Sequence, residues 1–130
     1  MKPRVITTEE APSPVARYSQ GILGAGLLFT AGQGGFDPDT GELIQGIGEQ
    51  TRRTLENIDA VLRAGGSSFA SALKVTIFLQ DLGDFEAMNE VYSQYVSDSP
   101  LCRTTVQAVL GAGMLIEIDA SALAGSSGAG

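Results

Sequence analysis

Two segments with the apolar spacing of amphipathic helices are separated by a strand-like segment, and this alternation restricts the folds available to the chain. The first helical segment extends from about Gly46 to Ala64, where Gly65-Gly66 provides a stop, and the second begins with Asp84 as its N-cap. Between them, residues 73–79 form an apolar, β-branched run that predicts a buried strand. Helices that lie between strands favour one sheet with both helices on one face, which is an α+β layer fold.

Further strand-like segments lie before the first helix and after the second. They cover residues 4–7, 18–23, 27–33, 104–110 and 114–123. Gly24-Ala25-Gly26 supplies the positive φ of a tight hairpin, and Gly111-Ala112-Gly113 predicts that the last two strands form a closing hairpin. The predicted order is β-β-β-α-β-α-β-β. The uncovered face of the sheet needs a partner, for which identical subunits are the simplest choice.

The composition narrows the classes of function. The chain has 130 residues with 15 acidic and 8 basic side chains, and the resulting net charge of −7 argues against general nucleic-acid binding. Cys102 is the single cysteine, so no internal disulfide forms and a reducing compartment such as the cytoplasm is expected. We expect no signal peptide, no membrane-spanning segment and no membrane partner.

The sequence contains no histidine, and this restricts the chemistry further. The usual general base near neutral pH and the most frequent metal ligand are both missing. Serine–histidine and cysteine–histidine mechanisms are therefore excluded. Any reaction must use Asp, Glu, Arg, Lys, Tyr, hydroxyl groups, the one cysteine or the backbone.

Two charged residues lie within or beside the closing strands. Arg103 opens one of these strands, and Glu117 lies between Ile116 and Ile118 in the other. Alternation places Glu117 on the face opposite the two isoleucines. An arginine can clamp a carboxylate with two hydrogen bonds, and a partly buried glutamate can act as a general base on water. The alternative is that Arg103 and Glu117 form a solvated ion pair on the surface.

Three further features have both a structural and a functional interpretation. The phenol of Tyr18 offers a polar contact to a ligand, although an aromatic in a core or an interface is the commoner case. Cys102 has no neighbouring base and is interpreted as a structural thiol. The glycines of residues 31–35 fit no nucleotide-binding motif, and they predict a turn or a close backbone approach.

A set of short motifs follows in a fixed order along the chain. They are Ala11-Pro12, Tyr18-Ser19-Gln20, Gly32-Gln33, residues 37–42, residues 54–58, residues 74–79, Leu82, Asp84-Phe85, Asn89, Tyr92, Arg103 and residues 116–120. In this set and order the chain resembles the reactive-intermediate deaminase family, RidA/YjgF, over nearly its whole length. Residues 1–124 are therefore assigned to one deaminase domain, and residues 125–130 to a flexible Gly/Ser tail.

The resemblance implies a chorismate-mutase-like fold, in which three subunits close their sheets into a barrel with active sites between subunits. It implies hydrolysis of reactive 2-imino acids and their enamine tautomers to 2-oxo acids and ammonia, with no metal or organic cofactor. Arg103 matches the arginine that binds the substrate carboxylate, and Glu117 matches the glutamate that positions the attacking water. Tyr18, Gly32 and Asn89 match positions that line the pocket.

Several positions depart from the family pattern. Ala31 stands where many members have a serine before the Gly-Gln pair, and Ala16-Arg17 stand where Gly-Pro is frequent. Thr105 stands at a substrate-binding position that is often cysteine, where its backbone can still serve. Because Arg103 and Glu117 are both present, we expect imine hydrolysis with a changed substrate range.

Two other functions stay open on the sequence alone. A non-catalytic protein of the same fold that binds small carboxylates would not need the serine hydroxyl missing at Ala31, but it would not need Glu117 either. An RNA-cleaving translation inhibitor is disfavoured by the acidic charge and by the absence of both histidine and a basic stripe.

Overall fold

The computed structural model of the chain describes residues 2–96 and 98–124, and its elements follow the predicted order β-β-β-α-β-α-β-β. The strands are β1 Arg4–Ile6, β2 Gly21–Gly24, β3 Leu27–Thr30, β4 Ala72–Leu79, β5 Cys102–Gln107 and β6 Ile116–Leu123. The helices are α1 Ile47–Ala64 and α2 Phe85–Tyr95, and short 3-10 turns at Phe69–Ser71 and Leu82–Asp84 precede β4 and α2. The α+β class is confirmed. The predicted tail, residues 125–130, lies outside the described residues.

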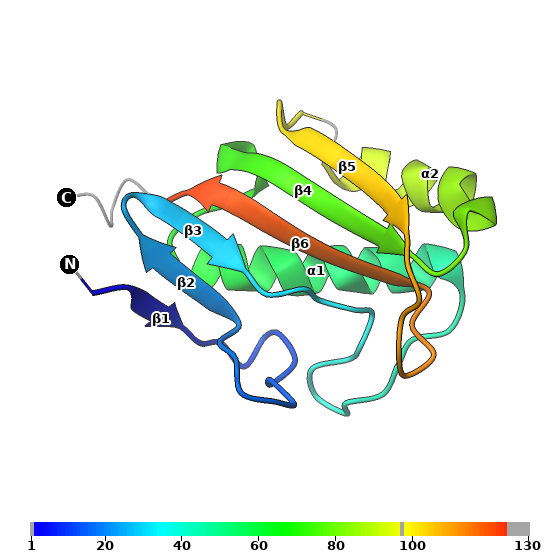
Figure 1. Ribbon diagram of the computed structural model, residues 1–130, viewed down its shortest axis with the longest axis horizontal. Helices are drawn as coiled ribbons and strands as arrows, with labels where there is room; N and C mark the ends of the chain where they lie inside the picture. Colours follow the sequence, from blue (N-terminus) through cyan, green and yellow to red (C-terminus); the bar gives the residue numbers. More distant parts are fainter. Residues whose placement is uncertain (1, 97, 125–130) are drawn as a thin grey trace.

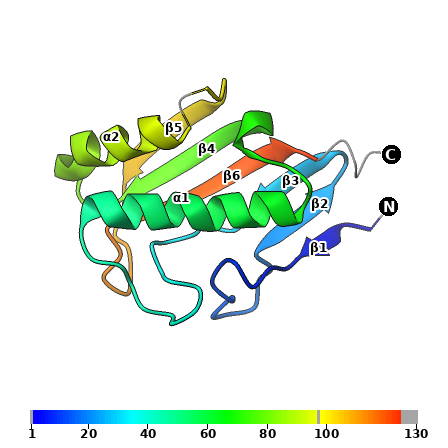
Figure 2. The same cartoon turned by 180° about the vertical axis from the view of Figure 1, so that it is seen from behind.

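One sheet contains these strands in the order β1-β2-β3-β6-β4-β5. Figure 1 views the sheet from its open face, and Figure 2 shows both helices lying across the opposite face. The prediction that both helices cover one face is therefore confirmed. The face away from the helices is called the open face below.

The core lies between the sheet and the helices. Its apolar side chains recur at helical spacing on α1 and at every second residue on β6. Leu55, Ile58 and Leu62 recur at helical spacing on the buried face of α1 and are fully buried. Ile116 and Ile118 alternate along β6 and point toward the helices, where they are also fully buried. The intervening residues of β6 are left on the open face.

The helices begin and end close to the start and stop signals that the sequence predicts, with one difference. At the end of α1, the Gly66 N–H donates to Arg63 O at 2.9 Å and the Ser67 N–H donates to Leu62 O at 2.8 Å. Gly66 has a φ of +79°, so this is a Schellman motif that requires a glycine. Asp84 occupies the N-cap position of α2, but its side chain makes no capping hydrogen bond, and Asp81 instead accepts from the Gly83 N–H.

The predicted closing hairpin is wrong. β5 pairs in parallel with β4, and β6 lies on the other side of β4 in antiparallel pairing. A strand–helix–strand unit places its two strands in parallel, and this requirement prevails over the local turn signal at Gly111–Gly113. Val75 of β4 is therefore flanked by Arg103 on one side and by Ala120 on the other.

The strand predicted for residues 18–23 begins only at Gly21. The reason lies in Gln20, whose buried side chain binds the backbone of the preceding loop. Its Oε1 accepts from the Thr8 N–H at 2.7 Å, and its Nε2 donates to the carbonyls of Thr8, Ala11 and Pro12. These bonds fold the chain back on itself and leave Tyr18 in a loop beside the end of the sheet.

The hairpin between β2 and β3 has the predicted tight turn. Gly24 pairs with Leu27, so the turn consists of Ala25 and Gly26, whose φ angles are +53° and +77°. Both residues are in the left-handed region that a type I′ turn requires. The turn is exposed, so a change there affects the backbone and no core contact.

We expect Ala25→Asn to raise the free energy of unfolding by about 0.5–1 kcal/mol, because asparagine adopts positive φ at a lower cost than alanine. Urea denaturation of both proteins under the same conditions measures the difference. Ala25→Val is the opposing control and should lower the free energy of unfolding, because a β-branched side chain is disfavoured at this φ. An unchanged or lower stability for Ala25→Asn would contradict the strain inferred at this turn.

Candidate functional site

The structure divides the predicted site residues between the two faces of the sheet. Val75 of β4 is buried under the helices, and Arg103, its partner in β5, shares that face. Phe78 of β4 points to the open face, and Glu117, its partner in β6, shares that face. The ion pairs of the described residues all join other side chains, so the interpretation of Arg103 and Glu117 as a surface ion pair is wrong.

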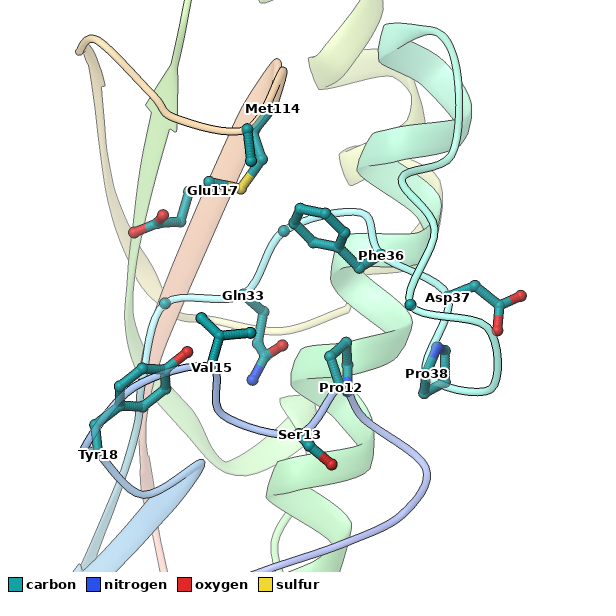
Figure 3. A pocket seen from close by; sticks show the side chains of 14 residues that line it. Pro12, Ser13, Val15, Tyr18, Gln33, Phe36, Asp37, Pro38, Met114 and Glu117 are labelled. Carbon is teal, nitrogen blue, oxygen red and sulfur yellow. The ribbon is translucent and has the colours of Figure 1, made fainter.

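Glu117 lies directly against the backbone of Gly32. A Cβ added to Gly32 would overlap the Glu117 carboxylate and would lie 2.9 Å from its Cδ, so only glycine fits here without displacing Glu117. The position of Gly32 against Glu117 is fixed by the neighbouring residues, because Gln33 and Ile118 exchange backbone hydrogen bonds of 2.8 and 2.9 Å. Tyr18, Gly32 and Glu117 line one cavity, which Figure 3 shows from close by. The structure thus brings these three predicted residues together.

The glycine-rich segment after β3 is the close backbone approach that the sequence predicts. A Cβ on Gly35 would lie 2.9 Å from the backbone of Gln50 in α1, which cannot move aside without disturbing the helix. Asn57, about two turns further along α1 and fully buried, donates from Nδ2 to Gly34 O at 3.0 Å and to Phe36 O at 2.9 Å. Buried polar groups of α1 therefore hold this segment in place.

The protonation of Glu117 is shifted by its surroundings. Burial raises the pKa of the Glu117 carboxyl, and the negative charge of Asp119 two residues along β6 raises it further. Burial likewise raises the pKa of Asp119, while a hydrogen bond from Thr76 and the charge of Lys74 oppose that shift. Glu117 therefore holds a proton more readily than an exposed glutamate, which suits a group that accepts a proton and passes it on.

Arg103 lies on the other face, under α2. Its Nη1 donates to Asn89 Oδ1 at 2.7 Å, so these two predicted residues are in direct contact. The guanidinium carbon lies 4.8 Å from the ring centroid of Tyr92 and 5.5 Å from that of Phe85. Two aromatic faces and an amide oxygen orient the guanidinium, and no acidic side chain of the described residues neutralises it.

Unused hydrogen-bonding groups surround Arg103. The Tyr92 hydroxyl and the Thr105 Oγ1 are buried and have no hydrogen-bond partner in the described part of the chain. Burial raises the pKa of Tyr92, while the charge of Arg103 and its close approach to the hydroxyl oppose that shift, so the hydroxyl stays neutral. Buried polar atoms without partners are rare in native structures. A cation with two free hydroxyls beside it is suited to receive an anion such as a carboxylate.

The sequence did not single out Phe85 and Tyr92 as site residues. Their signal is the helical spacing of Phe85, Asn89 and Tyr92, at positions i, i+4 and i+7, which aligns all three on the face of α2 that meets Arg103. Gln33 belongs to the Gly32-Gln33 motif, and its side chain lines the cavity near Glu117 (Figure 3). Cys102 is exposed, and its Sγ donates to Leu73 O at 3.3 Å.

No group of three or more His, Cys, Asp or Glu side chains within residues 2–96 and 98–124 is arranged to hold a metal ion. No helix in the same residues is long and apolar enough to cross a membrane.

Comparison with known proteins identifies close relatives. The family model described as Endoribonuclease L-PSP matches residues 8–124. A RutC family protein of Pyrococcus abyssi is 47% identical over 94% of this chain and 98% of its own length. The human 2-iminobutanoate/2-iminopropanoate deaminase is 38% identical over 94% of this chain and 90% of its own length. The crystal structure of E. coli TdcF with bound serine superposes with a TM-score of 0.89 at 35% identity, covering 92% of this chain and 98% of TdcF.

The raised pKa of Glu117 has a consequence for stability. A carboxyl with a higher pKa in the folded than in the unfolded state contributes stability while it is protonated, and this contribution is lost as the pH rises through the folded-state pKa. We therefore expect Glu117→Gln to raise the thermal midpoint relative to the wild type at pH 7, with a smaller difference at pH 3.5. Thermal unfolding followed across this range measures the effect.

The control for that measurement is Glu42→Gln, which also removes one negative charge but lies at an exposed turn. A difference between Glu117→Gln and the wild type that does not change with pH would show that burial of the ionised carboxylate is not the cause. If Glu117→Gln and Glu42→Gln gave the same dependence of the thermal midpoint on pH, the same conclusion would follow.

Proposed function

Because this chain belongs to the Endoribonuclease L-PSP family, which is the RidA/YjgF family, we propose that it hydrolyses 2-imino acids and their enamine tautomers to 2-oxo acids and ammonia. The observation that carries the proposal is the environment of Arg103. Its guanidinium has no acidic partner and lies beside two buried hydroxyls without partners, so a carboxylate ligand would satisfy all three groups. The human relative is named for this reaction. A cytoplasmic location agrees with the single, unpaired Cys102.

The active site is proposed to combine residues of two copies of the chain. Arg103 and Glu117 face opposite sides of one sheet, so they can meet only if Arg103 of one copy approaches the open face of another. The open face carries exposed apolar side chains, among them Phe29, Val106 and Leu123, that a second copy would cover. A closed ring of three copies uses the same contact three times and leaves no face uncovered. We therefore propose a homotrimer.

The proposed mechanism needs a carboxylate clamp and one acid–base group. Arg103 binds the substrate carboxylate through two hydrogen bonds, which places the protonated imine carbon beside Glu117 of the neighbouring copy. Glu117 accepts a proton from water as the water oxygen bonds to that carbon and the C=N electron pair moves to nitrogen. The same carboxyl then returns the proton to nitrogen. As the C–N bond breaks, Glu117 accepts the hydroxyl proton and the C=O bond of the 2-oxo acid forms; transfer of that proton to the leaving ammonia restores the carboxylate. The raised pKa of Glu117 makes it a stronger base toward the attacking water.

Two alternatives each have one observation in their favour. TdcF, a structural relative, was crystallised with serine, which is consistent with a protein that only binds small carboxylates. The family model is named for an endoribonuclease, but the net charge of −7 opposes binding to a phosphate backbone. Depletion of imine separates the first alternative from the proposal, and salt-dependent binding of RNA would support the second.

The direct test is the loss of imine in the presence of the protein. An amino-acid oxidase generates 2-iminobutanoate in situ, and semicarbazide traps the imine that remains. We expect Arg103→Ala to lower kcat/KM by about 100-fold, because two charge-assisted hydrogen bonds to the carboxylate are lost. We expect Glu117→Gln to lower kcat by about 100-fold to 1,000-fold with a smaller effect on KM.

The controls for this test are Arg52→Ala and Glu42→Gln, which remove the same charges from exposed positions. The oligomeric state of every variant is measured by light scattering. If the wild type depletes 2-iminobutanoate no faster than the buffer, hydrolysis of this imine is ruled out, and the site is better described as a binding site for small carboxylates.

Mixing of the two inactive variants tests whether the site is shared. If Arg103→Ala and Glu117→Gln chains are unfolded together and refolded at equal amounts, one site in about four pairs an intact Arg103 with an intact Glu117. We expect about one quarter of the wild-type activity to return. Separately refolded variants that are mixed afterwards provide the control. No recovery in correctly assembled mixed oligomers would place both groups in one chain and contradict the proposed arrangement.

A further inference from the structure

The cavity beside Glu117 is much larger than a small imino acid requires. In a single copy of the chain it has a volume of about 480 Å³ and extends from Tyr18 and Glu117 to the loop that contains Phe36 and Pro38 (Figure 3). A methyl group occupies about the volume of one water molecule, about 30 Å³. We infer that the preferred substrates are 2-imino acids with a large, uncharged side chain that fills this cavity. This inference rests on the proposed function and specifies its substrate class.

The wall of the cavity is mainly apolar. Val15, Phe36 and Met114 contribute side chains to it, and Pro12 and Pro38 lie at its far end (Figure 3). The wall is tightly built, because a Cβ on Gly34 would meet the sulfur of Met114 at 2.5 Å and the ring of Phe36 at 3.1 Å. An apolar side chain of four or more heavy atoms gains free energy by leaving water for such a surface.

The charges around the cavity exclude ionised side chains. No Lys or Arg of the described residues lines it, so an acidic side chain would find no counter-ion and would be repelled by Glu117. The carboxylate of Asp37 points away from the cavity in Figure 3, and its Oδ1 already accepts from the N–H groups of Asp39 and Thr40 at 2.7 and 3.2 Å. A basic side chain would find only the Glu117 carboxylate, which the proposed reaction already uses to activate water.

Gln33 supplies a polar group to the wall of the cavity. The residue is 6% exposed, and its side chain lines the cavity near Glu117 (Figure 3). A neutral side chain with a hydrogen-bonding atom, such as the thioether of a methionine-derived imine, offers a partner to the Gln33 amide.

The test compares imines that differ only in their side chain. Amino-acid oxidases generate the imines of alanine, leucine, methionine and glutamate, and kcat/KM is determined from the loss of semicarbazide-trapped imine. We expect the leucine-derived and methionine-derived imines to exceed the alanine-derived imine by at least about tenfold in kcat/KM. The glutamate-derived imine should fall at least about tenfold below the methionine-derived imine, because its carboxylate finds no counter-ion in the cavity.

A matched pair of variants locates the selectivity in the cavity. Val15 is 94% exposed and lines the cavity, whereas Val109 is 93% exposed and lies outside it. Val15→Phe should narrow the cavity and lower the ratio of kcat/KM for methionine-derived over alanine-derived imine by about fivefold. The same ratio should stay within about twofold of the wild type in Val109→Phe, since no cavity wall is changed.

The outcomes distinguish this inference from the proposed function. Depletion of all imines at the buffer rate would overturn the proposed function itself. Depletion of the alanine-derived imine at least as efficiently as the larger ones would overturn only the inference about the side chain. A size preference that Val15→Phe and Val109→Phe change equally would show that the cavity does not set the selectivity, and this too would overturn the inference.

Discussion

The antiparallel pairing of β6 between β3 and β4 is the constraint on which the rest of the structure depends. A shift of this pairing by one residue would turn Ile116 and Ile118 out of the core and would bring Glu117 and Asp119 into it. Two carboxylates in an apolar core without counter-ions are strongly unfavourable, so only the observed register of β6 is stable. β6 also pairs with Gln33, and the same register therefore sets Gly32 against Glu117.

The sequence predicted what local patterns determine. Alternation along residues 116–120 placed Glu117 opposite the isoleucines, and the glycines at Gly32, Gly34 and Gly35 indicated close approaches that the structure contains. The family and the α+β class followed from the ordered motifs and from the order of helices and strands. These features need only the identity of a residue and of its near neighbours.

The remaining features depend on contacts between segments that are distant in sequence. The position of β5 beside β4 follows from the strand–helix–strand unit. The Gly111–Gly113 turn, interpreted as a hairpin, predicted β6 as the partner of β5, which is wrong. Tyr18 leaves the predicted strand because Gln20 binds a loop about ten residues earlier. The cluster around Arg103 requires the crossing of α2 over β5, which no local spacing specifies.

β5 forms one edge of the sheet and carries the arginine that the proposed reaction requires. Its outer backbone groups find no strand partner in the described part of the chain, and an unpaired edge tends to join other strands. In the proposed assembly, a chain without neighbours is therefore both inactive and prone to incorrect association. The concentration of assembled, active oligomer would then rise more steeply than in proportion to the amount of chain synthesised. A cell that makes very little of this protein would therefore have almost no imine-hydrolysing activity from it.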